Sequence, residues 1–385
     1  MYEPIDLVKY DVTSERGFLP KHDPAIYLSP AFQYWEGFAG EMPALLAAGT
    51  FGKYLRNMLV IDTCGLTDEE LAPAHVRLTF LLHGYMHECQ KNNLSIRVPA
   101  CLGVPLTVIS KRLGLPPVLS YSPYALNNWR RLDPEGPIAL GNLAVLQHFL
   151  GGLDEAWFIL VHIEIETHAG QAIIAAVRAQ EAAAQNDLAE VARQLKIMAT
   201  AQERMYKTLC RMLECCDPYI YFRRVRPYLF VPAGVVFEGV SPLDGTPQPF
   251  RGETGAQSTI APLFDAVLGI VHEPSNLSSH LAEMRWYMPP KHRALLEKVE
   301  GREPVSRIVQ VVHKLHDALM AYNECVEWLA KFRDKHYEYA ASYINKQANR
   351  SSTSASSNPT DIGTGGTQFM ASLRKHVDET RAAIL

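Results

Sequence analysis

Apolar residues recur every three or four positions along much of this chain, and the longest such run covers residues 302–345. Pro304 stands where the first turn of a helix tolerates proline, and no later residue up to Ile344 interrupts a helix. The recurring apolar positions are Val305, Ile308, Val312, Leu315, Leu319, Tyr322, Val326 and Leu329. We therefore predict one long helix over this run.

One imidazole, that of His336, lies on the apolar face of this predicted helix, with Arg333 one turn before it. A neutral imidazole on an apolar wall can serve as the axial ligand of a haem iron. A nearby guanidinium could pair with a haem propionate. A core histidine that only satisfies its own hydrogen bonds gives the same pattern, so this motif alone leaves both interpretations open.

The same spacing predicts further helices over residues 31–49, 68–90, 153–181, 187–216, 257–270 and 368–384. Thr67 and Glu70 form a capping-box pattern at the start of the second of these. Residues 99–120 are rich in proline and glycine and predict short helices with extended pieces, whereas 234–250 predicts a loop or short hairpin. The fold class is therefore mainly α, with a few short strands.

We place a domain boundary near residue 150. Residues 1–149 are predicted to form a smaller, mostly helical N-terminal domain that covers one side of the site, and residues 150–385 a large helical catalytic domain. Residues 346–362 are polar and low in complexity, and they lead into the Gly-Thr-Gly-Gly-Thr run at 363–367. A polar loop that ends in glycines and threonines is typical of an active-site lid.

Several polar residues occur inside apolar helices. His83 and His87 are four residues apart, but no third metal ligand is evident, which favours structural or exposed histidines. The helix at 153–181 is apolar nearly all round at first, which predicts burial, yet it contains His162, Glu166 and His168. These groups either satisfy one another internally or place His162 in a pocket. Because this helix has no Glu-x-x-His pair, a di-iron site is disfavoured.

Composition narrows the classes of protein. The 385 residues are 48% hydrophobic and 20% charged, as in a soluble globular protein, and the net charge of −4 suggests no nucleic-acid or anionic-membrane partner. The N-terminal segment is too polar for a signal peptide, and no apolar run could span a membrane. Seven scattered cysteines without a Cys-x-x-Cys pair indicate reduced thiols. We expect a cytoplasmic monomer, and any haem to be non-covalently bound because no Cys-x-x-Cys-His motif occurs.

Four motifs together resemble one family. They are the segments 115–129 (from Leu-Pro-Pro to Trp), 252–270 (GETGAQSTIAPLFDAVLGI), 284–293 (MRWYMPPKHR) and 363–367 (GTGGT). In order and spacing the chain resembles the indoleamine 2,3-dioxygenases, haem enzymes that open the indole ring with O2, from about Gly17 to the C-terminus. The glycine-rich loop in the second motif lacks the lysine of a phosphate-binding loop, so a phosphate site is disfavoured.

The resemblance implies a role for each matching residue. His336 falls on the proximal haem ligand, Arg333 on the partner of a haem propionate and of Asp265, and Arg226 on the clamp for the substrate carboxylate. Thr364 belongs to the closing lid. The loop over the haem edge falls on Gly252, Glu253, Thr254 and Gly255. The distal face of the haem and the substrate fall against Tyr121, Tyr124, Ala125, Phe158 and Tyr221. The implied cofactor is haem b, with O2 as co-substrate and an external reductant.

Three positions depart from the mammalian pattern of that family. The distal position that is usually serine falls on His162, or on Val161 if the match is displaced by one residue. A distal histidine resembles the tryptophan 2,3-dioxygenases, where it bonds the indole N–H. Tyr124 and Tyr221 replace smaller or non-hydroxylated residues, and Glu253 replaces a glycine.

The resemblance implies insertion of O2 across the C2–C3 bond of tryptophan or a related indoleamine, which gives an N-formylkynurenine-type product. Two alternatives stay open. One is a different oxidation or rearrangement of an indole, as in pyrrolnitrin biosynthesis. The other is a non-catalytic haem-binding protein.

Overall fold

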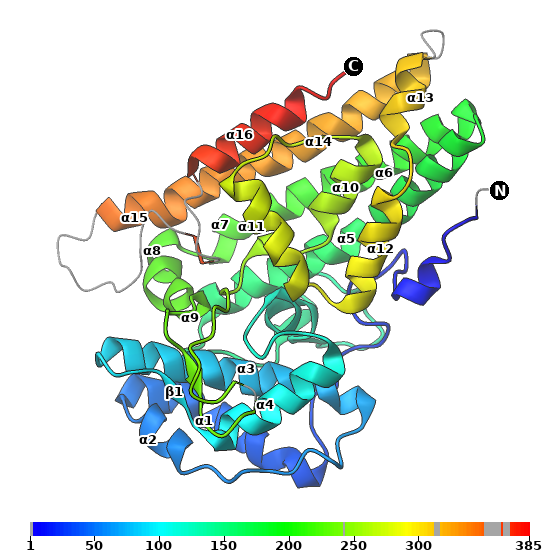
Figure 1. The fold of residues 1–385 in the computed structure, drawn as a ribbon. Coiled ribbons are helices and arrows are strands. Elements are labelled where there is room, and N and C mark those ends of the chain that lie inside the picture. Colours follow the sequence, from blue (N-terminus) through cyan, green and yellow to red (C-terminus); the bar gives the residue numbers. More distant parts are fainter. Residues whose placement is uncertain (1–2, 242, 312–315, 350–362, 365–369) are drawn as a thin grey trace.

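The computed structural model describes residues 3–241, 243–311, 316–349, 363–364 and 370–385. Helices account for most of this part of the chain, which confirms the mainly α prediction (Figure 1). The strands are short and pair in twos: β1 (Arg97–Val98) runs parallel to β4 (Val236–Phe237), and β2 (Trp129–Arg131) runs antiparallel to β3 (Leu143–Val145). The loop or short hairpin predicted for 234–250 is present as one antiparallel bridge, in which the Gln248 N–H donates to the Val235 carbonyl at 2.8 Å, while β4 also pairs with β1.

The N-terminal helices form one layer, at the bottom of Figure 1. They are η2 (Pro30–Phe32), α1 (Gln33–Ala48), α2 (Phe51–Arg56), α3 (Asp68–Lys91) and α4 (Ala100–Leu113). The first short helix, η1 (Leu7–Tyr10), lies instead beside α12 (Pro290–Glu300) of the second layer. Thr67 and Glu70 make the predicted capping box, with the Thr67 N–H donating to Glu70 Oε2 at 3.1 Å. The short pieces expected between 99 and 120 are wrong for α4, which continues past Pro105. Burial of its apolar face outweighs the local cost of that proline.

The remaining helices form a second, larger layer. They are α5 (Leu153–Ala184), α6 (Leu188–Cys210), α7 (Met212–Cys215), α8 (Pro218–Ile220), α9 (Arg226–Leu229), α10 (Ile260–Leu268), α11 (Asn276–Met284), α12 (Pro290–Glu300), α13 (Val305–Val311), α14 (His316–Ala340), α15 (Lys346–Asn349) and α16 (Met370–Arg381). Short turns join them, namely η5 (Gly255–Gln257) and η6 (Arg285–Tyr287). Helix α6 packs against both α5 and α14, and α16 packs on α14 (Figure 1).

The long helix predicted at 302–345 is present as α13 and α14, and the continuity of the two lies outside the described residues. Most of the predicted lid, at 350–362 and 365–367, also lies outside them. The boundary near residue 150 stays a prediction.

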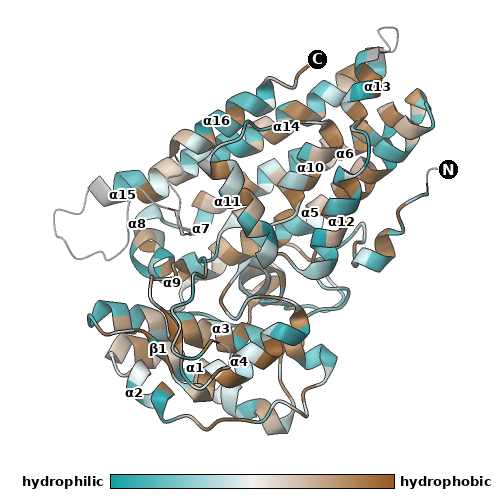
Figure 2. Ribbon diagram, viewed as in Figure 1, coloured by the Kyte–Doolittle hydropathy of each residue, from teal (hydrophilic) through white to brown (hydrophobic). Residues whose placement is uncertain are grey.

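Two apolar clusters form the core, and α5 belongs to both. Ile159 and Ile163 pack into the cluster built on α1, α3 and α4, whereas Val161 and Ile165 pack into the cluster built on α6, α10 and α14. This explains why α5 is apolar nearly all round, as its sequence predicts. Apolar residues accordingly face inward in both layers (Figure 2). The polar side chains of α5 thus lie where the two clusters meet.

Candidate active site

Two histidines from different helices face the same interior space. His336 on α14 has a solvent-accessible surface. Desolvation by the surrounding protein nevertheless lowers its pKa to about 4, and the nearby His162 on α5 contributes to this lowering. A side chain that is both accessible and strongly desolvated faces an enclosed space rather than the outer surface. Neither ring nitrogen of His336 is hydrogen-bonded to any residue that the structure describes. His336 is therefore a neutral imidazole at pH 7 with a free lone pair.

His162 has one defined tautomer. Its Nδ1 lies 2.7 Å from the carbonyl oxygen of Phe158 and must donate to it, so Nε2 carries the lone pair. Burial lowers the pKa of His162, which keeps the ring neutral at pH 7. The neighbouring Val161 is fully buried in the second apolar cluster. Of the two candidates for the distal position, His162 is the one that lies close enough to His336 to lower its pKa.

Aromatic side chains form one wall of this space. The Phe158 ring lies 4.8 Å from the His162 ring and 4.7 Å from the Tyr221 ring, measured between centroids. Tyr121 lies 6.1 Å from His162, and Tyr124 lies 6.3 Å from Phe158. The Tyr124 hydroxyl is buried without a hydrogen-bond partner among the described residues. The structure thus brings together the aromatic residues that the resemblance implied, next to buried Ala125.

Three short π-helical turns supply much of this wall. They are η3 (Ser122–Leu126), η4 (Tyr221–Val225) and η7 (Ala341–Asn345). Tyr343 of the last turn packs edge-on against Tyr221 at 5.4 Å. A π-helical turn widens the backbone by one residue, so it changes the direction in which following side chains point. Such turns are common at functional sites, and sequence periodicity did not predict them.

Arg226 is the buried arginine among the three at 223–226. It is 2% exposed, and its guanidinium carbon lies 5.9 Å from the centre of the Phe222 ring. Burial lowers the pKa of Arg226, and nearby Tyr221 opposes that effect. A guanidinium held at this depth offers a fixed fork that suits a carboxylate.

The glycine-rich loop closes one side of the site. A Cβ atom on Gly252 would lie 2.2 Å from the Leu229 carbonyl oxygen and 2.5 Å from that of Thr364. Only glycine therefore fits where the loop, α9 and Thr364 meet. The Thr254 hydroxyl accepts from the Ala256 N–H, which starts η5, and a Cβ on Gly255 would meet no atom within 4 Å. Thr364, a described residue of the predicted lid, thus touches the loop beside α9.

On the side of His336, Arg333 and Asp265 form an ion pair of 2.6 Å. Burial alone would raise the pKa of Asp265, but Arg333 and His272 together lower it. Sequence reasoning missed the remaining members of this group. His272 Nδ1 lies 2.6 Å from Glu379, and Arg333 also donates to the Thr380 hydroxyl at 2.6 Å. No local pattern links these residues, which come from the segment between α10 and α11 and from α16.

Sequence reasoning also missed the role of Glu166. The Tyr121 hydroxyl donates to its Oε1 at 2.9 Å, and the Ser258 hydroxyl does so at 3.1 Å. Burial raises the pKa of Glu166 to about 7. An acid one turn after His162 on a buried helix was the available signal. Glu166 fixes the orientation of the Tyr121 ring beside His162.

His83, one of the other sequence candidates, is structural. His83 uses both ring nitrogens on the backbone, since Nδ1 donates to the Tyr228 carbonyl at 2.6 Å and Nε2 accepts from the Leu119 N–H at 3.1 Å. It cannot bind a metal in this state.

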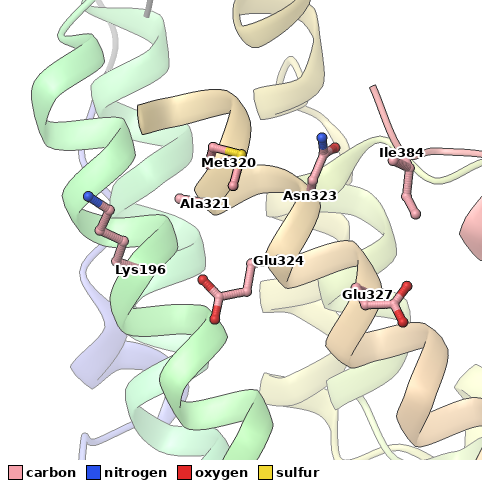
Figure 3. Close-up of a pocket in the computed structure, with 7 residues that line it drawn as sticks. All are labelled: Lys196, Met320, Ala321, Asn323, Glu324, Glu327 and Ile384. Atoms are coloured by element: carbon pink, nitrogen blue, oxygen red, sulfur yellow. The ribbon is translucent and has the colours of Figure 1, made fainter. Parts of the chain in front are cut away.

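A groove between α6, α14 and the C-terminal residues is lined by Lys196, Met320, Ala321, Asn323, Glu324, Glu327 and Ile384 (Figure 3). It lies at the opposite end of α14 from His336 and shares no residue with the site.

A sequence model of the family described as indoleamine 2,3-dioxygenase matches residues 6–383. The chain belongs to the indoleamine 2,3-dioxygenase family. Indoleamine 2,3-dioxygenase 1 of Mus musculus is 33% identical over 98% of this chain and 96% of its own. The 6-hydroxytryptophan 2,3-dioxygenase of Fusarium equiseti is 31% identical over 97% of both chains. Myoglobin of Haliotis madaka is 30% identical over 88% of this chain and 89% of its own.

Membership in the indoleamine 2,3-dioxygenase family makes this protein a haem-dependent oxidoreductase that inserts dioxygen into the indole ring of tryptophan or a related indoleamine. The residues present fit a haem. His336 offers a neutral, unbonded imidazole toward an enclosed space, and Arg333 offers a cation on the same helix one turn away. Among the described residues, no helix is both long and apolar enough to cross a bilayer.

Proposed function

We propose that the protein would bind haem b in the space between α5 and α14, with the His336 imidazole holding its iron, and that it opens the indole ring of tryptophan or a closely related indoleamine. When bound, the haem supplies the iron centre at which O2 is activated. The observation that carries the proposal is the pair of neutral imidazoles, His336 and His162, that face one space from opposite helices. The protein's own part is to bind, orient and exclude water.

The proximal residues would hold the cofactor by charge as well as by ligation. Arg333 already pairs with Asp265 at 2.6 Å, so its guanidinium is held in one orientation. Its remaining N–H donors can pair with a propionate. The backbone of the 252–255 loop would lie along the haem edge.

The distal residues would orient the substrate. His162 Nε2 carries a lone pair and can accept the indole N–H, because Nδ1 is committed to the Phe158 carbonyl. The rings of Phe158, Tyr221 and Tyr124 would stack around the indole. Arg226 would bind the carboxylate at the amino-acid end, and Thr364, which touches Gly252, would close that end against water.

The direct test is incubation of the haem-loaded, reduced protein with tryptophan and O2, followed by mass spectrometry of the product. We expect an N-formylkynurenine-type product that has gained two oxygen atoms. A product with one added oxygen, or a rearranged one, would instead support the alternative indole oxidation. As the matched control, His336→Ala should lose the Soret band and the product together, whereas His292→Ala should retain both. His292 is also buried with a pKa lowered to about 4, but it packs against Phe18.

The relatives named myoglobin in Haliotis favour one second candidate, reversible binding of O2 without chemistry on a substrate. The buried guanidinium of Arg226 argues against it, since an oxygen carrier has no carboxylate to hold. Stable, reversible oxygenation with no consumption of tryptophan would establish this second function.

The cellular setting belongs to the same proposal. All seven cysteines are free, which is consistent with a reducing compartment such as the cytoplasm. All the residues placed in the site come from a single chain, so a monomer with an external reductant would suffice. Size-exclusion chromatography of the haem-loaded protein tests the monomer.

A further inference from the structure

Glu253 is a buried carboxylic acid that the account above does not use. Its side chain is 4% exposed. Its backbone N–H donates to the Leu229 carbonyl at 3.0 Å, which fixes this part of the loop beside α9. The carboxyl group itself makes no hydrogen bond or ion pair with any residue within the described ranges. A buried acid without a partner is costly, so its presence needs an explanation.

The surroundings of Glu253 show where its carboxyl group points. The negative charge of Glu253 contributes to raising the pKa values of Tyr121, Tyr124 and Tyr221. Tyr121 directly precedes η3, Tyr124 lies in η3, and Tyr221 lies in η4. All three belong to the aromatic wall described above. The loop is also tied to this wall by hydrogen bonds, because Gln257 Nε2 donates to the Gly252 carbonyl at 2.9 Å and Gln257 Oε1 accepts from the Tyr121 N–H at 2.9 Å. Glu253 therefore faces the substrate side of the site rather than the loop exterior.

The carboxyl group is distinct in position from Arg226. Although both residues are described, they do not form an ion pair with each other. Burial is the cause that raises the pKa of Glu253 to about 8, and no cation of the described protein offsets it. The site thus holds the Arg226 guanidinium as a fixed cation. At a different position it holds the Glu253 carboxyl group, which a cationic ligand would stabilise. That arrangement complements a zwitterionic amino-acid end, with its carboxylate and ammonium.

We propose that Glu253 binds the ammonium group of the substrate and makes the enzyme selective for indoles that carry a primary amine. The proposal rests on the proposed function, because it takes the distal space as the substrate site. Arg226 and Glu253 then recognise opposite ends of the same headgroup. Because Glu253 acts independently of Arg226, indole-3-alkylamines without a carboxylate also become ligands. Neutral indoles and indole acids lack the cation and are disfavoured.

The test is a titration of the haem-loaded protein, followed by the shift of its Soret band, with three probes. Tryptophan carries both headgroups, tryptamine only the ammonium, and indole-3-propionate only the carboxylate. Glu253→Gln is expected to raise the Kd of tryptophan and tryptamine by about 10- to 100-fold, the range for a buried charge-assisted hydrogen bond, and that of indole-3-propionate less than about threefold. Arg226→Ala should instead raise the Kd of tryptophan and of indole-3-propionate, which carry a carboxylate, and leave the Kd of tryptamine nearly unchanged.

Two controls separate recognition from folding. Glu283→Gln removes a carboxylate that pairs with Arg251 of the same loop, at 2.8 Å and partly in solvent, and should leave all three Kd values unchanged. If Glu253→Gln fails to hold haem, the wild-type protein still decides the matter. Tryptamine should bind it at least about tenfold more tightly than 3-propylindole, a neutral analogue of similar shape.

The outcomes are distinguishable. Equal weakening of all three probes by Glu253→Gln, no weakening at all, or equal affinity of the wild type for tryptamine and 3-propylindole would overturn the role of Glu253 and leave the proposed function standing. A wild type that holds haem but binds no indole would overturn both.

Discussion

At the scale of single residues, the use of the ring nitrogens separates His162 and His336 from His75 and His83. His75 bonds the Ser110 hydroxyl at 3.1 Å and His83 is used by the backbone on both sides, so burial is compensated within the protein. His162 uses one nitrogen and His336 uses neither within the described residues. His336 therefore has a lone pair for a cofactor, and His162 Nε2 has one for a substrate.

The free Nε2 of His162 yields a prediction about the indole N–H. His162→Ala should raise the Kd of tryptophan by about 2- to 12-fold, which corresponds to one neutral hydrogen bond. The Kd of 1-methyltryptophan, which has no N–H to donate, should rise much less. Both are measured by Soret titration, with haem content as the check on folding. Equal losses for the two ligands would show that His162 acts only by filling space.

Buried carboxyl groups predict how stability depends on pH. Burial raises the pKa of Glu253 to about 8 and of Glu166 to about 7, above the usual 4.5. The folded state therefore binds more protons than the unfolded state between these values. The resulting contribution to stability is fully present below pH 4.5 and is lost as pH rises through 7 and 8. Tyr121, Tyr124 and Tyr221 face Glu253 but have pKa values raised above 10, so they stay protonated in this window.

The free energy of unfolding of the wild type should fall between pH 5 and pH 9 as Glu253 loses its proton. In Glu253→Gln this fall should be smaller by roughly 3 kcal/mol, which is the free energy that corresponds to the raised pKa of Glu253 over this range. Urea unfolding of the haem-loaded protein at the two pH values measures this difference. Glu283→Gln, on the same side of the molecule but partly in solvent, serves as the comparison and should match the wild type. If the free energy of unfolding of Glu253→Gln depended on pH as in the wild type, a group other than Glu253 would be responsible for the pH dependence.

At the scale of elements, one tight contact between backbones holds the loop, α9 and Thr364 together. Gly252→Ala would place a Cβ atom 2.2 Å from one carbonyl oxygen and 2.5 Å from another, and neither backbone can move without displacing Arg226 or Thr364. We expect kcat/KM for tryptophan to fall at least about tenfold, with a loss of about 1–3 kcal/mol in stability. Gly255→Ala, three residues along the same loop, meets no atom within 4 Å and should change neither. Similar effects of both variants would contradict a specific contact.

The elements themselves were largely predictable, but not the features that build the site. Periodicity gave α1, α3 and α5 nearly to their ends, and it placed α6, α13 and α14 in the right parts of the chain, because an apolar stripe records which face is buried. It missed the π-helical turns η3 and η4, since one extra residue per turn leaves no mark on a short aromatic segment. It also missed the continuity of α4 through Pro105, where burial outweighs a local rule.

At the scale of the whole molecule, the site lies where the two apolar clusters meet on α5. Tyr121 and Tyr124 belong to the first cluster, and Tyr221 and Tyr343 to the second. No sequence pattern brings His336 opposite His162 or Asp265 to Arg333, because these pairings are set by tertiary packing. The resemblance supplied the residues, and the structure shows which of them share one space. Glu166 and Glu379 needed the tertiary contacts to be found at all.

This position predicts that the cofactor stabilises the whole fold. Residues from α5, α14, η3 and η4 surround the space, so a haem bound there would contact both clusters at once and bind the folded state only. A ligand at about a thousand times its Kd adds about 4 kcal/mol to the free energy of unfolding. In a chain of 385 residues that corresponds to a rise of roughly 5–10 °C in Tm.

Scanning calorimetry of the protein before and after haem removal measures this shift. His336→Ala supplies the comparison, because adding haem to it should change Tm little if the imidazole carries the affinity. The same Tm with and without haem would mean that the cofactor sits outside the meeting point of the two clusters. A full shift in His336→Ala would mean instead that the protein envelope, rather than the axial bond, dominates binding.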